Sequence, residues 1–151
     1  MIQLNDLKLD NNLISSKSIA INAGPEIVWG ILTDPTWISQ YLFGAETITD
    51  WKPGSAILFR IKFDNQVFID KGIVVECNEP ESLKYRYWSG FCGLEDKPEN
   101  YSIVSYHIEK IDSKASKLTW SQTGFVDEQS RSSSENSLVN ILGQIKSFAE
   151  H

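Results

Sequence analysis

The chain has few of the residues that build metal centres or covalent cross-links. Its 151 residues include two cysteines, Cys77 and Cys92, and two histidines, His107 and His151. No CxxC motif occurs, and these four positions do not have the spacing of a zinc site. We therefore expect no bound metal, and we expect free thiols in a protein of the cytoplasm.

Long apolar runs and clusters of positive charge are absent as well. The N-terminal stretch MIQLNDLKLDNNL has acids and amides where a secretory signal needs a basic start and an apolar run. No stretch approaches the roughly 20 apolar residues that span a bilayer. Lys and Arg number 14 against 20 Asp and Glu, giving a net charge of −6. Nucleic acids and anionic membrane surfaces attract concentrated positive patches, so we expect neither as a partner and no membrane insertion.

Signatures of catalysis are missing too. The sequence has no Ser-His-Asp order, no paired carboxylates and no glycine-rich phosphate loop. Asp50 is expected to hold the backbone amides of a turn at 52–54, and His107 and Glu109 are expected to face solvent. We predict no catalytic residue and no cofactor. The balance is against an enzyme, but the sequence leaves this question open.

What the chain does contain is a heavy aromatic load, with five Trp, five Tyr and seven Phe. A length of 151 residues with 41% hydrophobic residues suits one domain around one core. We expect this domain to span residues 16–150. Residues 1–15 would be an N-terminal extension or an edge strand.

The apolar periodicity predicts an α+β architecture. A strand over 16–22 is followed by two short helices, which Pro25 starts and Asp34-Pro35 separates. A period of two then predicts strands, and a long final helix follows over 127–150 with one apolar stripe. The expected strands span residues 44–50, 56–63, 67–77, 83–87, 101–111 and 117–124. Short turns make these strands an antiparallel meander, so we expect a curved sheet of about seven strands with the last helix across its concave face.

Five segments in this order resemble the helix-grip fold of the SRPBCC superfamily, also called START-like or Bet-v-1-like. They resemble most closely the branch of the activator of heat-shock-protein-90 ATPase homologues. The segments are PEIVWGILTDP, FGAETITDWKPGSAILFR, GIVVECNEPESLKYRYW, DKPENYSIVSYHIEK and KLTWSQTGF. The resemblance covers about residues 16–125 and implies a cavity between the sheet and the last helix. It does not imply one activity, because this fold carries binders, cyclases and chaperone partners.

The chain departs from this resemblance at the start of its last helix. Relatives of this type usually have a Trp near the place where Leu138 stands here, and the preceding segment SRSSSEN is unusually polar. Both differences predict a wetter and roomier mouth for the cavity.

The strand phases predict which side chains face this cavity. The concave face would hold Phe59, Ile61, Phe63, Ile73, Val75, Val104, Leu118 and several residues with polar tips. Polar groups on an interior face are costly unless they are paired, so they indicate either a ligand site or pairing inside a filled core. Arg131, at the mouth, would meet a carboxylate or phosphate. The predicted ligand-binding residues are Trp29, Trp37, Phe59, Ile61, Phe63, Tyr85, Tyr87, Tyr106, Trp120, Gln122, Arg131, Leu138, Ile141, Leu142 and Ile145.

Three functions remain open from the sequence. The first is binding of a small hydrophobic or amphipathic molecule, such as a lipid-like or polycyclic compound. The second, implied by the resemblance, is a co-chaperone that stimulates a heat-shock-protein-90-like ATPase. The third is a polyketide cyclase or dehydratase, which needs an interior acid–base pair. The phase of 67–77 is ambiguous, and if Asp70 or Glu76 faced inward the third function would gain support.

Overall fold

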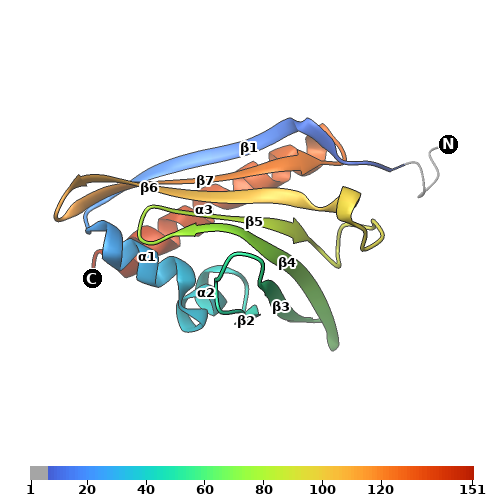
Figure 1. Ribbon diagram of the computed structural model, residues 1–151, viewed down its shortest axis with the longest axis horizontal. Coiled ribbons are helices and arrows are strands. Elements are labelled where there is room, and N and C mark those ends of the chain that lie inside the picture. The colour runs from blue at the N-terminus through green and yellow to red at the C-terminus, as the bar shows by residue number, and fades with distance from the viewer. Residues whose placement is uncertain (1–6) are drawn as a thin grey trace.

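The computed structural model describes residues 7–151 and has the predicted α+β helix-grip architecture (Figure 1). A seven-stranded antiparallel sheet carries two short helices after its first strand and one long helix at its end. The elements are β1 (Asp10–Ile21), α1 (Pro25–Thr33), α2 (Pro35–Tyr41), β2 (Glu46–Ile48), β3 (Ala56–Phe63), β4 (Gln66–Asn78), β5 (Ser82–Trp88), the 3-10 turn η2 (Pro98–Asn100), β6 (Ser102–Asp112), β7 (Ala115–Phe125) and α3 (Glu128–Ala149).

The strands follow one another across the sheet in the order β1-β7-β6-β5-β4-β3-β2. Strands β2 to β7 form the expected meander, and β1 pairs antiparallel with β7 at the far edge, where Ile19 lies opposite Leu118. The first strand is longer than predicted, because residues 10–15 belong to it. The first six residues of the predicted extension lie outside the part of the chain that the structure describes.

The two short helices are held by a few local contacts. Pro25 occupies the first turn of α1. Asp34 ends that helix and caps the next, since its carboxylate accepts a hydrogen bond from the Thr36 amide at 2.8 Å. The Tyr41 hydroxyl then donates to the Leu32 carbonyl at 2.9 Å, which fastens α2 against α1 inside the core.

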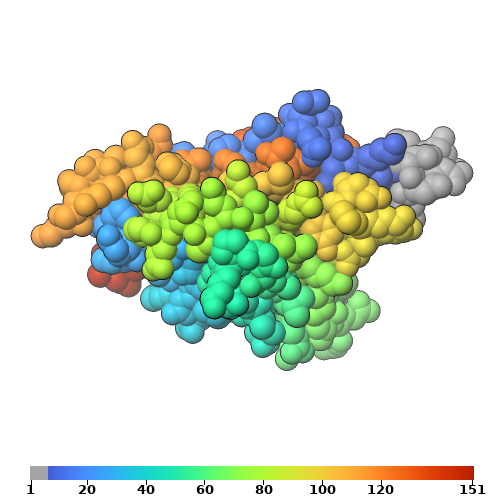
Figure 2. Space-filling model, viewed as in Figure 1, coloured from blue at the N-terminus to red at the C-terminus, as the bar shows by residue number. Residues whose placement is uncertain are grey.

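Helix α3 covers one face of the sheet. Asp127 caps its start by accepting from the Ser130 amide at 2.8 Å. Its buried stripe consists of Leu138, Ile141, Leu142, Ile145 and Ala149. In Figure 1 the helix runs behind the strands, and Figure 2, seen from the same side, shows the strands hiding most of it.

The predicted inward phase of β4 is wrong. Ile73 and Val75 are 43% and 48% exposed, whereas the Val74 between them is buried. Val74 lies directly opposite Tyr85, and Gly72 lies opposite Tyr87. Paired residues of an antiparallel ladder share a face, and the tyrosines of β5 face inward. Gly72 and Val74 therefore face inward too, and so does Asp70, which lies two residues before Gly72 on the same side of the strand. The more apolar phase of β4 therefore faces outward.

Candidate functional site

A cavity of about 150 Å³ lies between the concave face of the sheet and α3. Its lining is mostly apolar and aromatic, with a few hydroxyl and amide groups, and no lining residue carries a charge. It is lined by Leu42, Phe59, Tyr85, Tyr87, Val104, Trp120, Gln122, Ser134, Ser137, Leu138 and Ile141. This composition is typical of sites for small molecules.

The structure brings about half of the predicted site residues to this cavity. Those that line it are Phe59, Tyr85, Tyr87, Trp120, Gln122, Leu138 and Ile141. Those that do not are Trp29, Trp37, Ile61, Phe63, Tyr106, Arg131, Leu142 and Ile145.

The aromatic residues outside the lining have other places. Trp29 is buried and borders an open hollow outside α1, beside Asp50 and Lys52. The Trp37 ring packs on Phe148 near the end of α3, with ring centres 4.8 Å apart. Tyr106 is buried and packs against Tyr85 and Trp120, which both line the cavity.

The aliphatic residues of the predicted set that do not line the cavity lie either in the filled core or on a part of the sheet that α3 does not cover. Leu142 and Ile145 are buried in the hydrophobic core. Along β3, burial fades from Phe59 to Ile61, and Phe63 is 64% exposed at the end of the strand. Alternation gives a residue its face, but only cover from a second layer turns that face into an interior.

Arg131 is turned away from the cavity and bound to two acids of its own helix. Its guanidinium meets Glu128 and Glu135, each at 2.8 Å, and reaches the Ile14 carbonyl of β1 at 3.4 Å. These two carboxylates raise the pKa of Arg131. The structure gives no reason to expect an anion there, because the two carboxylates already exceed the single positive charge of the arginine.

Four lining residues were missing from the predicted set, and one of them, Val104, was expected on the concave face but not as a ligand contact. Ser134 and Ser137 come from α3, and Leu42 follows α2. The signal for Ser134 was available in the polar segment SRSSSEN, where a small side chain leaves space at the cavity; Ser137 lies just after this segment. Leu42 gave no such signal, because its position depends on how α2 ends.

Two tyrosines form a hydroxyl pair in the wall. The Tyr85 and Tyr106 oxygens lie 2.7 Å apart. The Tyr106 ring packs on Trp120 with centres 4.4 Å apart, and Tyr85 meets Tyr106 edge-on. Burial raises the pKa of both phenols well above the ordinary value. Both remain protonated in the folded protein near neutral pH.

The most unexpected group is a buried carboxylate behind the cavity wall. Asp70 is 4% exposed and accepts three hydrogen bonds. The Tyr87 hydroxyl donates to one carboxylate oxygen. The other oxygen accepts from the Ser89 hydroxyl at 3.0 Å and from the Gly90 amide at 2.9 Å. Burial, followed by the Asp70 charge, raises the pKa of Tyr87. The sequence left Asp70 ambiguous, and its partners show that it faces inward.

A second hollow of about 210 Å³ lies under the loop that follows β5, and it also lacks charged lining residues. It shares Tyr87 and Gln122 with the cavity under α3. These two side chains therefore border two spaces whose linings carry no charge.

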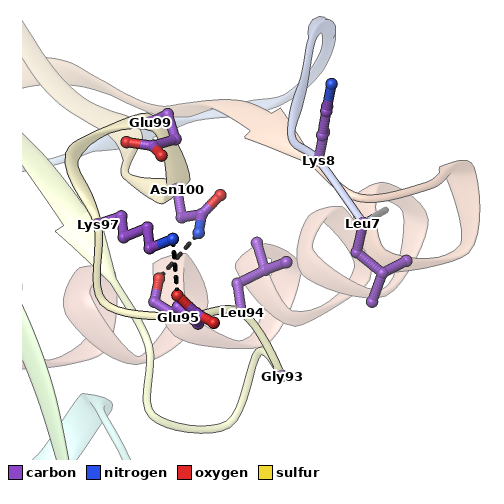
Figure 3. A pocket seen from close by; sticks show the side chains of 8 residues that line it. All are labelled: Leu7, Lys8, Gly93, Leu94, Glu95, Lys97, Glu99 and Asn100. Carbon is purple, nitrogen blue, oxygen red and sulfur yellow. Dashed lines mark hydrogen bonds and ion pairs between the residues drawn. The ribbon is translucent and has the colours of Figure 1, made fainter. Parts of the chain in front are cut away.

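Another hollow, of about 270 Å³, lies where residues 7–8 approach the loop 93–100 (Figure 3). Some of its polar side chains already have partners within the loop. Lys97 binds Glu95 at 2.8 Å, and the Asn100 amide donates to the Glu95 carbonyl at 2.9 Å. It shares no residue with the cavity under α3, so we do not treat it as part of the site.

Grouped metal ligands and helices that could cross a membrane are both absent from the part of the chain that the structure describes. Within residues 7–151, no three His, Cys, Asp or Glu side chains are grouped to hold a metal ion. None of the helices over the same range is both long and apolar enough to cross a membrane.

The family comparison gives one clear match. A sequence model of the family described as "Activator of Hsp90 ATPase homolog 1-like protein" matches residues 22–150. A comparison with curated protein sequences finds no match.

Solved structures of the same shape are numerous. A protein from Cytophaga hutchinsonii is 31% identical, with a TM-score of 0.78 over 92% of this chain and 94% of that one. The Aha1 dimer from Colwellia psychrerythraea is 12% identical, with a TM-score of 0.70 over 91% of this chain and 96% of that one. An HSP90 activator from Plasmodium falciparum is 16% identical, with a TM-score of 0.68 over 89% and 94%. The last two comparisons show a shared fold.

Proposed function

This chain belongs to the activator of Hsp90 ATPase homolog 1-like family, and we propose that it binds a small hydrophobic or amphipathic molecule in the cavity under α3. The observation that supports this proposal is the hollow itself. Large side chains surround it on the sheet, but Ser134, Ser137 and Leu138 leave its helical side open. Close-packed interiors contain few spaces larger than a water molecule, so a space of this size needs an explanation.

The size of the cavity limits the part of the ligand that it can hold. A dry cavity of about 150 Å³ in another protein accommodates benzene, so a body the size of one ring fits here. Six buried carbons would contribute about 5 kcal/mol at roughly 0.8 kcal/mol each, before the costs of association. Before those costs, 5 kcal/mol corresponds to a Kd of about 0.2 mM, so a ring alone would bind more weakly than this, and a longer ligand that passes the serines would bind more tightly.

Two experiments test this proposal. Native mass spectrometry of protein purified gently from its own cells should show a retained small molecule and its mass. Amide NMR spectra with added butylbenzene should show shifts confined to residues that line the cavity. Shifts spread over the surface, or none at all, would refute the proposal.

A matched pair of variants tests whether butylbenzene binds inside the cavity or on the surface. Leu138→Trp fills the cavity from α3, whereas Val139→Trp adds the same side chain at a position that is 61% exposed. Butylbenzene should lose its shifts in the first variant and keep them in the second.

Catalysis is a weaker candidate on this geometry. A cyclase or dehydratase needs an acid–base pair that touches its substrate. Asp70 is interior, but it is absent from the lining and meets the cavity only through the Tyr87 hydroxyl. No His or carboxylate is among the lining residues.

Binding to a chaperone of the heat-shock-protein-90 type is the second candidate. The family description and the Plasmodium falciparum structure support it. The outer face of β3 and β4 adds an apolar surface, since Leu58, Ile73 and Val75 are each more than a third exposed. A pull-down at micromolar concentration with the chaperone from the same cell tests it. Ile73→Lys should abolish a contact at this face, and absence of any binding would dismiss this candidate.

A further inference from the structure

Some polar groups of the cavity wall have already used their protons. Tyr87 donates its hydroxyl proton to Asp70, and Ser137 donates its own to the Ser133 carbonyl at 3.1 Å. The Gln122 amide nitrogen donates one of its two protons to the Ser102 hydroxyl at 3.3 Å, which leaves its carbonyl oxygen and its second proton for another partner. A side chain whose protons are used can only accept. Three lining groups therefore present lone pairs to the cavity.

Donors remain on the sheet side as well. Gln122 keeps its second amide proton, and the Trp120 indole N–H has no hydrogen-bond partner among the residues that the structure describes. The Tyr85 and Tyr106 hydroxyls carry two protons and form one hydrogen bond with each other. The second proton of this pair is available to an oxygen of a ligand when Tyr85, which lines the cavity, holds it. The wall can thus offer donors beside acceptors, and a ligand group that both donates and accepts suits it.

The charges around the cavity favour the same kind of ligand. Neither the cavity nor the adjoining hollow has a lysine or arginine in its lining. Asp70 lies directly behind Tyr87. Arg131, the cation that could have offset it from α3, is bound to Glu128 and Glu135.

We infer that the molecule bound here carries a hydrogen-bond donor, a hydroxyl or an amine, at the end that meets Tyr87 and Gln122, and not a carboxylate or a phosphate. This inference rests on the proposed function and narrows it to a chemical class. A hydroxyl fits best, because it gives its proton to a lone pair of the wall and accepts the spare proton of the tyrosine pair. An ionised carboxylate has no proton to give, and it would lose water next to acceptors and a buried negative charge.

A series of probes with one body and different ends tests the inference on the unaltered protein. The probes are butylbenzene, phenylpropanol, phenylpropylamine and phenylpropanoate, each titrated by amide NMR at neutral pH. We expect phenylpropanol to bind about tenfold or more tightly than phenylpropanoate, because unsatisfied buried acceptors and like charge oppose the acid. Phenylpropanoate binding as tightly as phenylpropanol would overturn the inference.

The same series separates this inference from the proposed function. If butylbenzene and phenylpropanoate bind alike, and phenylpropanol gains nothing, the cavity is a ligand site without the predicted polarity. If none of the four binds, the proposed function fails, and the inference fails with it.

Two variants locate the effect. Asp70→Asn removes the negative charge but keeps an oxygen that can accept from Tyr87, so phenylpropanoate should gain about fivefold or more relative to butylbenzene. Gln122→Leu removes one acceptor and should weaken phenylpropanol about fivefold while butylbenzene binds at least as well. An unchanged ratio in both variants would place the selectivity elsewhere and refute the assignment to these groups.

Discussion

Removing the Tyr87 hydroxyl should destabilise the protein far more than removing a comparable hydroxyl at the surface. Tyr87→Phe keeps the ring and deletes only the oxygen that donates to Asp70. Asp70 is 4% exposed, so water cannot replace the lost donor. Hydrogen bonds to charged groups contribute about 1.5–3 kcal/mol, so we expect the free energy of unfolding to fall by about 2 kcal/mol.

Tyr101→Phe is the matched control. Its hydroxyl also donates to an aspartate, Asp96, at 2.5 Å, but this bond lies at the surface, where water can take its place. We expect it to cost less than about 0.5 kcal/mol.

Urea unfolding followed by fluorescence measures both variants. With a slope of about 2 kcal/mol per molar urea, Tyr87→Phe should lower the midpoint by about 1 M and leave the slope unchanged. Equal midpoints for the two variants would refute the reasoning, because they would mean that water reaches Asp70. A changed slope would mean that the variant alters the compactness of one of the two states.

Three further predictions follow from the same structure. Burial raises the pKa of Tyr41, Tyr85, Tyr87 and Tyr106, and partial burial with a bond to Asp96 raises the pKa of Tyr101 to about 12. Because these folded pKa values lie above the unfolded value of about 10, they stabilise the fold below pH 10, and this contribution is lost as the pH rises through them. The ultraviolet absorbance of tyrosinate should therefore appear together with unfolding. Ionisation of several tyrosines before the protein unfolds would contradict their burial. Leu138→Trp should raise the free energy of unfolding by about 0.5–2 kcal/mol by filling the cavity, measured in urea against Val139→Trp, and a loss would mean that the space cannot hold the ring. Arg131→Ala should cost about 1 kcal/mol or less and leave the affinity for phenylpropanol unchanged, since the arginine joins α3 to β1 outside the cavity; a tenfold loss of affinity would restore it to the site.

The sequence predicts local structure here better than it predicts the site. Proline and aspartate mark the ends of α1 and α2, and both signals act within a few residues. Asp50 also has its predicted role, because it accepts from the Lys52 amide at 2.9 Å. His107 and Glu109 face solvent as expected.

The site depends on contacts between distant segments, which a period cannot show. Tyr106 is on the predicted face, but it packs on Trp120 and Tyr85 and is not among the lining residues. Arg131 is on the predicted stripe, but acids three positions before it and four positions after it hold its guanidinium. The phase of β4 is set by the tyrosines opposite, which lie more than ten residues away in the chain.

The inverted phase of β4 has a consequence for how this chain finds its own register. One face of the strand presents Ile69, Ile73 and Val75, and the other presents Asp70, Gly72 and Val74, so hydrophobicity alone would favour the wrong face. A slip by one residue would exchange the two sets. The carboxylate of Asp70 then favours the native register, because only the native pairing places Tyr87, Ser89 and the Gly90 amide around it. An engineer who replaced it with valine for a better core would remove the feature that separates the native pairing from its closest competitor.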